Sequence, residues 1–126
     1  KKVYFLDNGI RNIINAEFGD IRYRADNGAL FENFVLLELL RNLNPAGTVH
    51  FYRTRDGAEV DFVVNQVFEQ YAVECKYKTF QKPSHSKALD AFSEMESIDK
   101  RFIINKNLNT TERGVKFLQA YLVSKI

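Results

Sequence analysis

The longest amphipathic stretch of the chain lies between Leu30 and Leu43, where Leu, Phe and Val recur at helical spacing. A 3.6-residue period over this length predicts a helix, and Asn44-Pro45-Ala46-Gly47 ends it. Asn27 is suited to cap its start. Before this helix, the pattern predicts a strand from Val3 to Leu6 and a short helix from Ile10 to Asn15.

Strand-like runs dominate the middle of the chain. They are rich in β-branched and aromatic residues, and their short connections favour an antiparallel meander. The three runs are Val49 to Arg53, Glu59 to Asn65 and Gln70 to Lys78, and the turn-prone Thr54-Arg55-Asp56-Gly57 joins the first two.

A helix and a further strand follow the meander. The pattern predicts a helix from Pro83 to Ser97 and a buried strand from Arg101 to Asn105. A strand, a helix and another strand imply a right-handed crossover to a parallel neighbour. The tail from Gly114 to Ile126 fits either a helical or a strand period. Together these elements predict an α/β fold whose central mixed sheet, an antiparallel meander plus a parallel strand, is flanked by helices.

Composition supports one domain spanning residues 1–126, because the chain has 126 residues, 45% hydrophobic and 27% charged. The net charge of +2 permits a polyanionic partner without indicating one. A single cysteine excludes an internal disulfide framework and is compatible with a cytoplasmic location. No apolar run approaches the roughly 18 residues that span a bilayer, so no membrane association is expected. The Lys1-Lys2 start, without methionine, suggests a fragment of a longer polypeptide.

Glu32 is an unexpected carboxylate in the main helix. At 100° per residue it projects on the same face as Leu36, Leu39 and Leu43, the stripe predicted to face the core. An ionised carboxylate there costs several kcal/mol, so it must be neutral, hydrogen-bonded, salt-bridged or bound to a metal. Alternatively, Glu32 is a first-turn residue that caps the helix or favours its dipole.

Two neighbouring strands carry acidic faces. Period two puts Glu59 and Asp61 on one face of their strand, and Glu74 and Lys76 on one face of the next. If the apolar faces of the two strands lie on the same side, Asp61 and Glu74 come within metal-bridging reach. Such carboxylates suit Mg²⁺ or Mn²⁺, the cations that phosphodiester hydrolysis uses to neutralise phosphate and activate water. The alternative is an exposed sheet face with a solvated Glu-Lys pair.

The order of these residues resembles a nuclease superfamily. Glu32, Asp61 and Glu74-x-Lys76, on the predicted series of helix, meander, helix and strand, resemble the PD-(D/E)XK superfamily, whose fold is restriction-endonuclease-like. More narrowly, nearly the whole chain resembles the uncharacterised C-terminal domain that follows an AAA-type ATPase module in many bacterial and archaeal proteins. The motifs that carry this resemblance are Tyr4-Phe5-Leu6-Asp7-Asn8-Gly9, Gly28-Ala29-Leu30-Phe31-Glu32-Asn33-Phe34-Val35, Tyr52-Arg53, Glu59-Val60-Asp61-Phe62 and Val73-Glu74-Cys75-Lys76.

The resemblance implies roles for the matching residues. Asp61, Glu74 and the helix carboxylate Glu32 would bind the metal ion, and Asp61, Glu74 and Lys76 would form the catalytic group, with Lys76 as the catalytic lysine. Val60 stands where the superfamily has a proline, at a position that varies widely. The chain contains no Gly-x-x-x-x-Gly-Lys-Ser/Thr loop, so ATP binding would reside in an upstream module of the same polypeptide.

Other residues are weaker candidates. The basic residues that flank the proposed site are Arg53, Arg55, Lys78, Lys82 and Lys87. They are candidates for phosphate contacts, although basic residues on loops and strand ends are more often merely solvated. Cys75 is interpreted as an inert core thiol. His50 and His85 lack partners at zinc spacing. The aromatic residues predicted to pack in the core are Phe31, Phe34, Phe62 and Phe92.

Two hypotheses of function follow. The first is a metal-dependent nuclease-like domain that cleaves DNA or RNA phosphodiesters and is appended to an AAA-type ATPase. The second is a non-catalytic module that uses the same fold for nucleic-acid binding, protein docking or regulation of the ATPase, because one fold often hosts unrelated functions. The complete acidic set favours catalysis.

Overall fold

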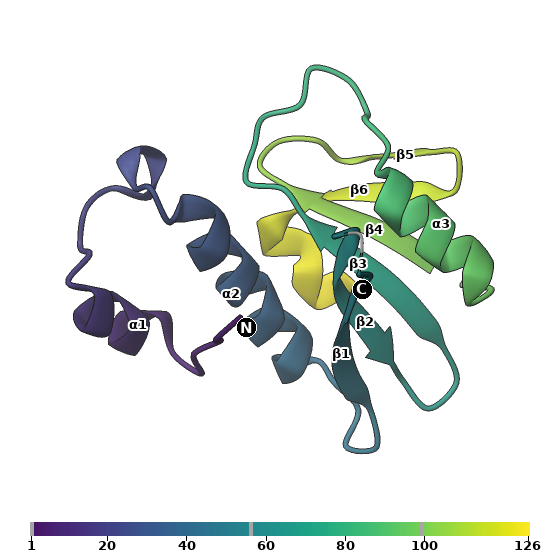
Figure 1. Cartoon of the computed structure of the whole chain (residues 1–126), viewed down its shortest axis with the longest axis horizontal. Coiled ribbons are helices and arrows are strands. Elements are labelled where there is room, and N and C mark those ends of the chain that lie inside the picture. Colours follow the sequence, from purple (N-terminus) through teal and green to yellow (C-terminus); the bar gives the residue numbers. More distant parts are fainter. Residues whose placement is uncertain (1, 56, 99) are drawn as a thin grey trace.

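Helices pack against both faces of one mixed sheet (Figure 1). The computed structural model describes residues 2–55, 57–98 and 100–126. In chain order the elements are α1 (Asn8–Asn15), the 3-10 helix η1 (Ile21–Tyr23), α2 (Asn27–Arg41), β1 (Thr48–Arg53), β2 (Glu59–Asn65), β3 (Gln70–Cys75), α3 (Lys87–Met95), β4 (Lys100–Asn105), β5 (Thr110–Glu112), β6 (Val115–Gln119) and the 3-10 helix η2 (Ala120–Lys125).

The sheet has six strands in the order β1-β2-β3-β4-β6-β5. The first three strands form an antiparallel meander, as their short connections predict. After the crossover through α3, β4 lies parallel to β3, and β6 lies parallel to β4. The short β5 pairs antiparallel with β6 at the edge. The predicted α/β class, with a meander plus parallel strands, is confirmed.

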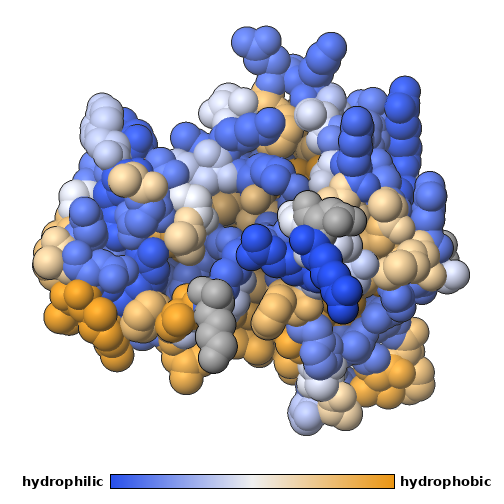
Figure 2. Space-filling view, viewed as in Figure 1, coloured by the Kyte–Doolittle hydropathy of each residue, from blue (hydrophilic) through white to orange (hydrophobic). Residues whose placement is uncertain are grey.

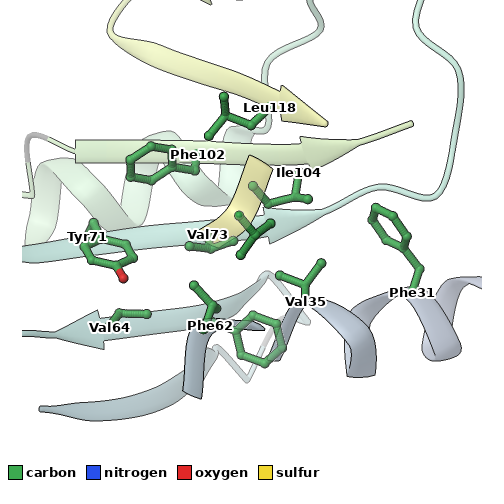
Figure 3. Packing of buried hydrophobic residues seen from close by; sticks show 11 residues of the cluster. Phe31, Val35, Phe62, Val64, Tyr71, Val73, Phe102, Ile104 and Leu118 are labelled. Atoms are coloured by element: carbon green, nitrogen blue, oxygen red, sulfur yellow. The ribbon is translucent and has the colours of Figure 1, made fainter. Parts of the chain in front are cut away.

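Two apolar cores lie on the two faces of the sheet. Figure 3 shows side chains of α2, β2, β3, β4 and β6 meeting in the core on the α2 face, among them Val35 and Phe62. The 3-10 helix η2 adds Val123 to this core. On the other face, Leu89 and Phe92 of α3 pack against the sheet. The packing roles predicted for the aromatic residues are confirmed, since Phe31, Phe62 and Phe92 are buried and Phe34 is partly buried.

A β-bulge interrupts the alternation of side chains along β2. The pairing register shifts between His50 and Tyr52 of β1, so Phe51 lies opposite two residues of β2, Asp61 and Phe62. Phe62 packs in the α2-side core. Asp61 faces the same side, where it shares a cation with a carboxylate of α2. Strict alternation predicted these two neighbours on opposite faces, and the extra residue of the bulge overturns that prediction.

The segment before α1 forms no strand, contrary to prediction. The backbone N–H of Phe5 donates to Asn33 Oδ1 at 2.8 Å, and Asn33 Nδ2 donates to the carbonyl of Phe5 at 2.9 Å. Asn33 Nδ2 also donates to Asn8 Oδ1 at 2.9 Å. A buried amide of α2 thus satisfies the backbone groups that a neighbouring strand would otherwise bond, and it ties the N-terminal segment to α2.

The predicted helices are present with shifted ends. Asp26, not Asn27, occupies the N-cap position of α2. α3 is shorter than predicted, because Ser86 caps it by accepting a hydrogen bond from the backbone N–H of Leu89. Among the described helices, none combines the length and the apolar character needed to cross a membrane.

The strand ends also differ from the prediction. β3 stops at Cys75 and does not reach Lys78. The tail that fits either period forms β6 followed by η2, and β5 was not predicted. Asp56 of the predicted turn lies outside the described residues.

The short helix α1 turns its apolar side chains to solvent. Ile10, Ile13 and Ile14 are exposed, and Figure 2 shows apolar surface over α1 at the lower left. Within α1, Arg11 is the buried residue. Burial of apolar surface therefore contributes little to holding α1 in place.

Candidate metal centre

The ammonium group of Lys2 lies among three carboxylates. Its Nζ atom is 2.9 Å from Glu32 Oε1 and 3.2 Å from Asp61 Oδ1, and it also pairs with Glu59 Oε1. These four residues are called the carboxylate cluster below. The cluster joins the N-terminal segment, α2 and β2, and it concentrates negative charge around one cation.

Hydrogen bonds hold the carboxylates in place. The Tyr4 hydroxyl donates to Glu32 Oε1, and the backbone N–H of Cys75 donates to Asp61 Oδ2 at 2.8 Å. Asn33, the residue after Glu32, accepts a hydrogen bond from the backbone N–H of Phe5 and so anchors the segment that carries Tyr4. The Glu32 side chain is 15% exposed, and it is satisfied by salt bridge and hydrogen bond. The sequence left Glu32 neutral, hydrogen-bonded, salt-bridged or bound to a metal, and the structure shows the hydrogen bond and the salt bridge.

Burial shifts the ionisation of the cluster. It raises the pKa of the Asp61 carboxyl to about 6, and the charge of Glu32 adds to the rise. Burial alone would lower the pKa of Lys2, but its hydrogen bonds to Glu59 and Glu32 outweigh burial and raise that pKa. Burial, together with the hydrogen bond to Glu32, also raises the pKa of the Tyr4 hydroxyl. Lys2 is therefore charged and Tyr4 neutral, whereas Asp61 titrates just below neutral pH.

Glu74 and Lys76 form a separate ion pair at the end of β3. Lys76 Nζ is 2.5 Å from Glu74 Oε1, and the Glu74 side chain is 6% exposed. Glu74 alternates with Val73 and Cys75, which face the α2-side core, so its side chain points to the other face of the sheet. The prediction that Asp61 and Glu74 share a face is wrong, because the bulge turns Asp61 toward α2. Asp61 meets Glu32 instead.

The second oxygen of Glu74 is a buried acceptor without a partner. Among the described residues, Oε2 of this side chain receives no hydrogen bond. Burial alone would lower the pKa of Lys76, but its hydrogen bond to Glu74 and the nearby charges of Glu74 and Asp61 raise it. Lys76 is therefore a charged ammonium that interacts with the carboxylates of both Glu74 and Asp61.

The cluster has the donor chemistry of a magnesium or manganese site without its geometry. The Glu32 and Asp61 oxygens lie 2.9 and 3.2 Å from the ammonium nitrogen of Lys2, which are hydrogen-bond distances. A bound Mg²⁺ would need its carboxylate oxygens closer, at roughly 2.0–2.1 Å. Within residues 2–55, 57–98 and 100–126, no three His, Cys, Asp or Glu side chains are arranged to hold a metal ion. Mg²⁺ usually takes only one or two protein carboxylates besides water and substrate phosphate, so the donor set still fits.

The profile of one family, described as a domain of unknown function (DUF4143), matches residues 27–123. The chain belongs to the DUF4143 family. The match covers the α2 and β2 members of the carboxylate cluster and the Glu74–Lys76 pair, whereas Lys2 and Tyr4 precede it. The resemblance to a family of uncharacterised domains is thereby confirmed. No significant match was found among curated proteins or among solved structures.

Arg53 is the predicted basic residue that contacts the cluster of this DUF4143 chain. Its Nε atom lies 3.8 Å from Glu59 Oε2. Lys78 Nζ instead lies over the ring of Phe80, 4.4 Å from its centroid. The remaining basic candidates, all with exposed side chains, are Arg55, Lys82 and Lys87.

The thiol of the lone cysteine and the two histidine rings take no part in the cluster. Burial raises the pKa of the Cys75 thiol well above its usual value, as expected for an inert core thiol. His50 shares a hydrogen bond with Thr48 Oγ1 at 2.9 Å, and His85 lies 3.6 Å from Glu112.

Three residues that meet at this site, Lys2, Tyr4 and Glu59, were not predicted as site residues. Glu59 had a sequence signal, since it shares a strand face with Asp61. Lys2 and Tyr4 had none, because Lys2 is 30 residues from Glu32 and 59 from Asp61, and Tyr4 is 28 residues from Glu32. Only the folded chain brings these groups together.

Proposed function

We propose that this domain is a divalent-metal-dependent phosphodiesterase that acts on nucleic acid, with a fold of the restriction-endonuclease-like, PD-(D/E)XK type. The observation that carries the proposal is the convergence of Glu32, Glu59 and Asp61 on one cation, Lys2 Nζ. Three carboxylates gathered around one point favour any cation that can replace the ammonium.

The residues have distinct tasks in this proposal. Asp61 and Glu32 would hold Mg²⁺ or Mn²⁺, with Glu59 as a further oxygen donor and Lys2 displaced. Bound there, the metal ion supplies positive charge to the phosphate and acidifies a water molecule. Lys76, held by Glu74, orients the attacking water or balances charge on the phosphate. Glu74 points to the other face of the sheet, so in this proposal it acts by holding Lys76 and not as a metal ligand.

The wider setting is part of the same proposal. By resemblance, the domain follows an AAA-type ATPase module in a cytoplasmic protein, and that module would bind ATP. The nuclease-like domain would then act where the motor brings nucleic acid.

A cleavage assay tests the proposed function. Supercoiled plasmid and a labelled single strand are incubated with the protein in Mg²⁺, Mn²⁺ or EDTA. We expect metal-dependent cleavage that falls roughly 100-fold or more in both variants, because Asp61→Asn weakens a metal ligand and Lys76→Ala removes a positive charge beside the phosphate. Glu69→Gln, which alters an exposed carboxylate paired with Lys100, is the matched control and should cleave normally.

Unchanged cleavage in both variants would contradict the site. A non-catalytic binding module is the second candidate, and the observation that favours it is that Lys2 Nζ already occupies the point where the carboxylates converge. It predicts no cleavage with either metal and no rise in melting temperature when Mn²⁺ is added. The catalytic proposal predicts such a rise, lost in Asp61→Asn, because a cation that binds only the folded state stabilises it.

A further inference from the structure

Phe51 is an exposed aromatic side chain beside the carboxylate cluster. It lies in the middle of β1, yet it is 70% exposed. No aromatic pair in the described part of the chain includes it. This separates Phe51 from the aromatic residues that fill the two cores, and it leaves one face of its ring open to a ligand.

Phe51 lines a small cavity. The cavity measures about 220 Å³, and its lining residues are Lys2, Phe51, Arg53 and Glu59. Pockets for drug-sized ligands begin near 300 Å³, so this one suits a smaller group. The Phe51 ring suits a planar group. Lys2 is paired with the carboxylate cluster, so the Arg53 guanidinium, 3.8 Å from Glu59, is the cation that can bind an adjoining negative charge.

The bulge gives this cavity its position. Because Phe51 lies opposite both Asp61 and Phe62, its side chain falls on the face that carries the carboxylate cluster. Arg53 is two residues further along β1, on the same face, and pairs across the strands with Glu59. Arg53 is 63% exposed, and its 3.8 Å contact with Glu59 exceeds hydrogen-bond distance, so this contact does not engage its guanidinium donors.

We propose that this cavity binds an unpaired nucleobase, with the base stacked on the Phe51 ring and Arg53 bonded to the adjoining phosphate. This inference rests on the proposed function and names its substrate class, single-stranded nucleic acid. Inside a duplex both faces of a base are covered by neighbouring base pairs, whereas an unpaired base can lie on an aromatic side chain. Stacking of this kind tolerates every base, since each has a π-face. The phosphate beside Arg53 then lies next to Glu59, the member of the carboxylate cluster that Arg53 contacts.

Tryptophan fluorescence tests the stacking directly, because the chain contains no tryptophan. Phe51→Trp places one reporter in the cavity. Phe68→Trp is the matched control, since Phe68 is 98% exposed in the β2–β3 connection. In EDTA, a short oligothymidylate should quench the emission of Phe51→Trp and leave Phe68→Trp unchanged. A blunt duplex should quench neither. Absence of quenching in Phe51→Trp, or equal quenching by the duplex, would overturn the proposal.

Affinity provides the second readout. In fluorescence anisotropy with labelled oligothymidylate, Phe51→Ala should weaken binding about five- to 100-fold, the effect of removing one stacked ring. Phe51→Trp should restore binding, and Phe68→Ala should bind like wild type. Equal affinities of Phe51→Ala and wild type would contradict a stacking site.

The two proposals fail separately. Binding is measured in EDTA and cleavage in Mn²⁺. Stacking without cleavage would contradict the phosphodiesterase alone, whereas metal-dependent cleavage without any effect of Phe51→Ala on binding would contradict the base site alone.

Discussion

Asp61 is an ionisable side chain whose surroundings favour its neutral form. Burial raises its folded-state pKa to about 6, whereas an unfolded aspartate titrates near 3.9. The folded state therefore binds this proton more tightly between those two values. By linkage, the ionisation of Asp61 lowers the free energy of unfolding as the pH rises from about 4 to about 6. Above pH 6 the full loss of stability remains. Such a cost is typical of groups retained for function rather than for stability.

Asp61→Asn removes this titration. We expect the variant to be more stable than wild type at pH 7, by about 2–3 kcal/mol, since its amide can still accept the hydrogen bond from Cys75. The difference should shrink toward zero near pH 4. Urea unfolding at several pH values measures it, with Glu94→Gln, an exposed carboxylate of α3, as the control. A wild-type advantage at pH 7 would contradict the buried-acid interpretation.

At the scale of elements, polar contacts rather than apolar burial attach α1 and η1 to α2. Arg11 Nη1 lies 2.6 Å from Asp26 Oδ2, and Arg24 Nε lies 2.8 Å from Asp26 Oδ1. The two arginine side chains are 8% and 4% exposed. Arg24 also donates to the carbonyl of Glu17 at 2.8 Å. Hydrogen bonds from Arg24, and then from Arg11, hold the pKa of Asp26 well below its usual range.

Asp26→Asn should therefore detach this region. The substitution removes the counter-charge of two guanidinium groups whose side chains are almost fully covered, so it should lower the free energy of unfolding by more than the loss of an exposed ion pair does. In wild type this contribution is complete above about pH 5. It begins to fall near pH 4, where the unfolded aspartate takes up its proton, and declines until the pH reaches the much lower pKa of the folded state. Urea unfolding measures the loss, and hydrogen exchange should accelerate mainly between Asn8 and Arg24.

The control for this prediction is an exposed ion pair. Glu69→Gln breaks the contact with Lys100, whose side chain is 58% exposed, and should cost under about 1 kcal/mol. A similar small effect of Asp26→Asn would show that the buried pairs are not what holds α1.

At the scale of the whole molecule, the carboxylate cluster closes only when three distant segments meet. Lys2 reaches it from the N-terminal segment, Glu32 from α2, and Glu59 and Asp61 from β2. The single ammonium reduces the repulsion among the carboxylates. If the proposed metal ion binds at the same point, Lys2 and the cation would compete for the carboxylates.

Lys2→Gln removes the competitor. We expect Mn²⁺ to bind the variant about tenfold more tightly, the effect of roughly 1.4 kcal/mol of charge interaction near a protein surface. Without metal, the variant should melt at a lower temperature than wild type, because the carboxylates then repel one another. Isothermal titration calorimetry measures the affinity. Lys100→Gln removes the same charge far from the cluster and should leave Mn²⁺ binding unchanged. Equal Mn²⁺ affinity in all three proteins would refute the competition.

The sequence by itself determined the central elements, which are α2, the meander of β1 to β3, α3 and β4. Apolar periodicity located α2 and β2, and short connections fixed the meander, because both signals are local. It also singled out Glu32, since a carboxylate on an apolar stripe must find a partner. The α/β class with a mixed sheet followed from these local signals.

Only the tertiary structure decided which charged groups meet. The bulge opposite Phe51 adds one residue to β2, and this single insertion reverses the face of Asp61, which no period-two pattern can reveal. The side-chain amide of Asn33 is hydrogen-bonded to the backbone of Phe5. The segment predicted as a strand is therefore fixed to α2, and this places Lys2 at the carboxylate cluster. These contacts join residues far apart in the chain. Their energies depend on distances and angles that are set only when the chain folds, so no local sequence pattern reveals them.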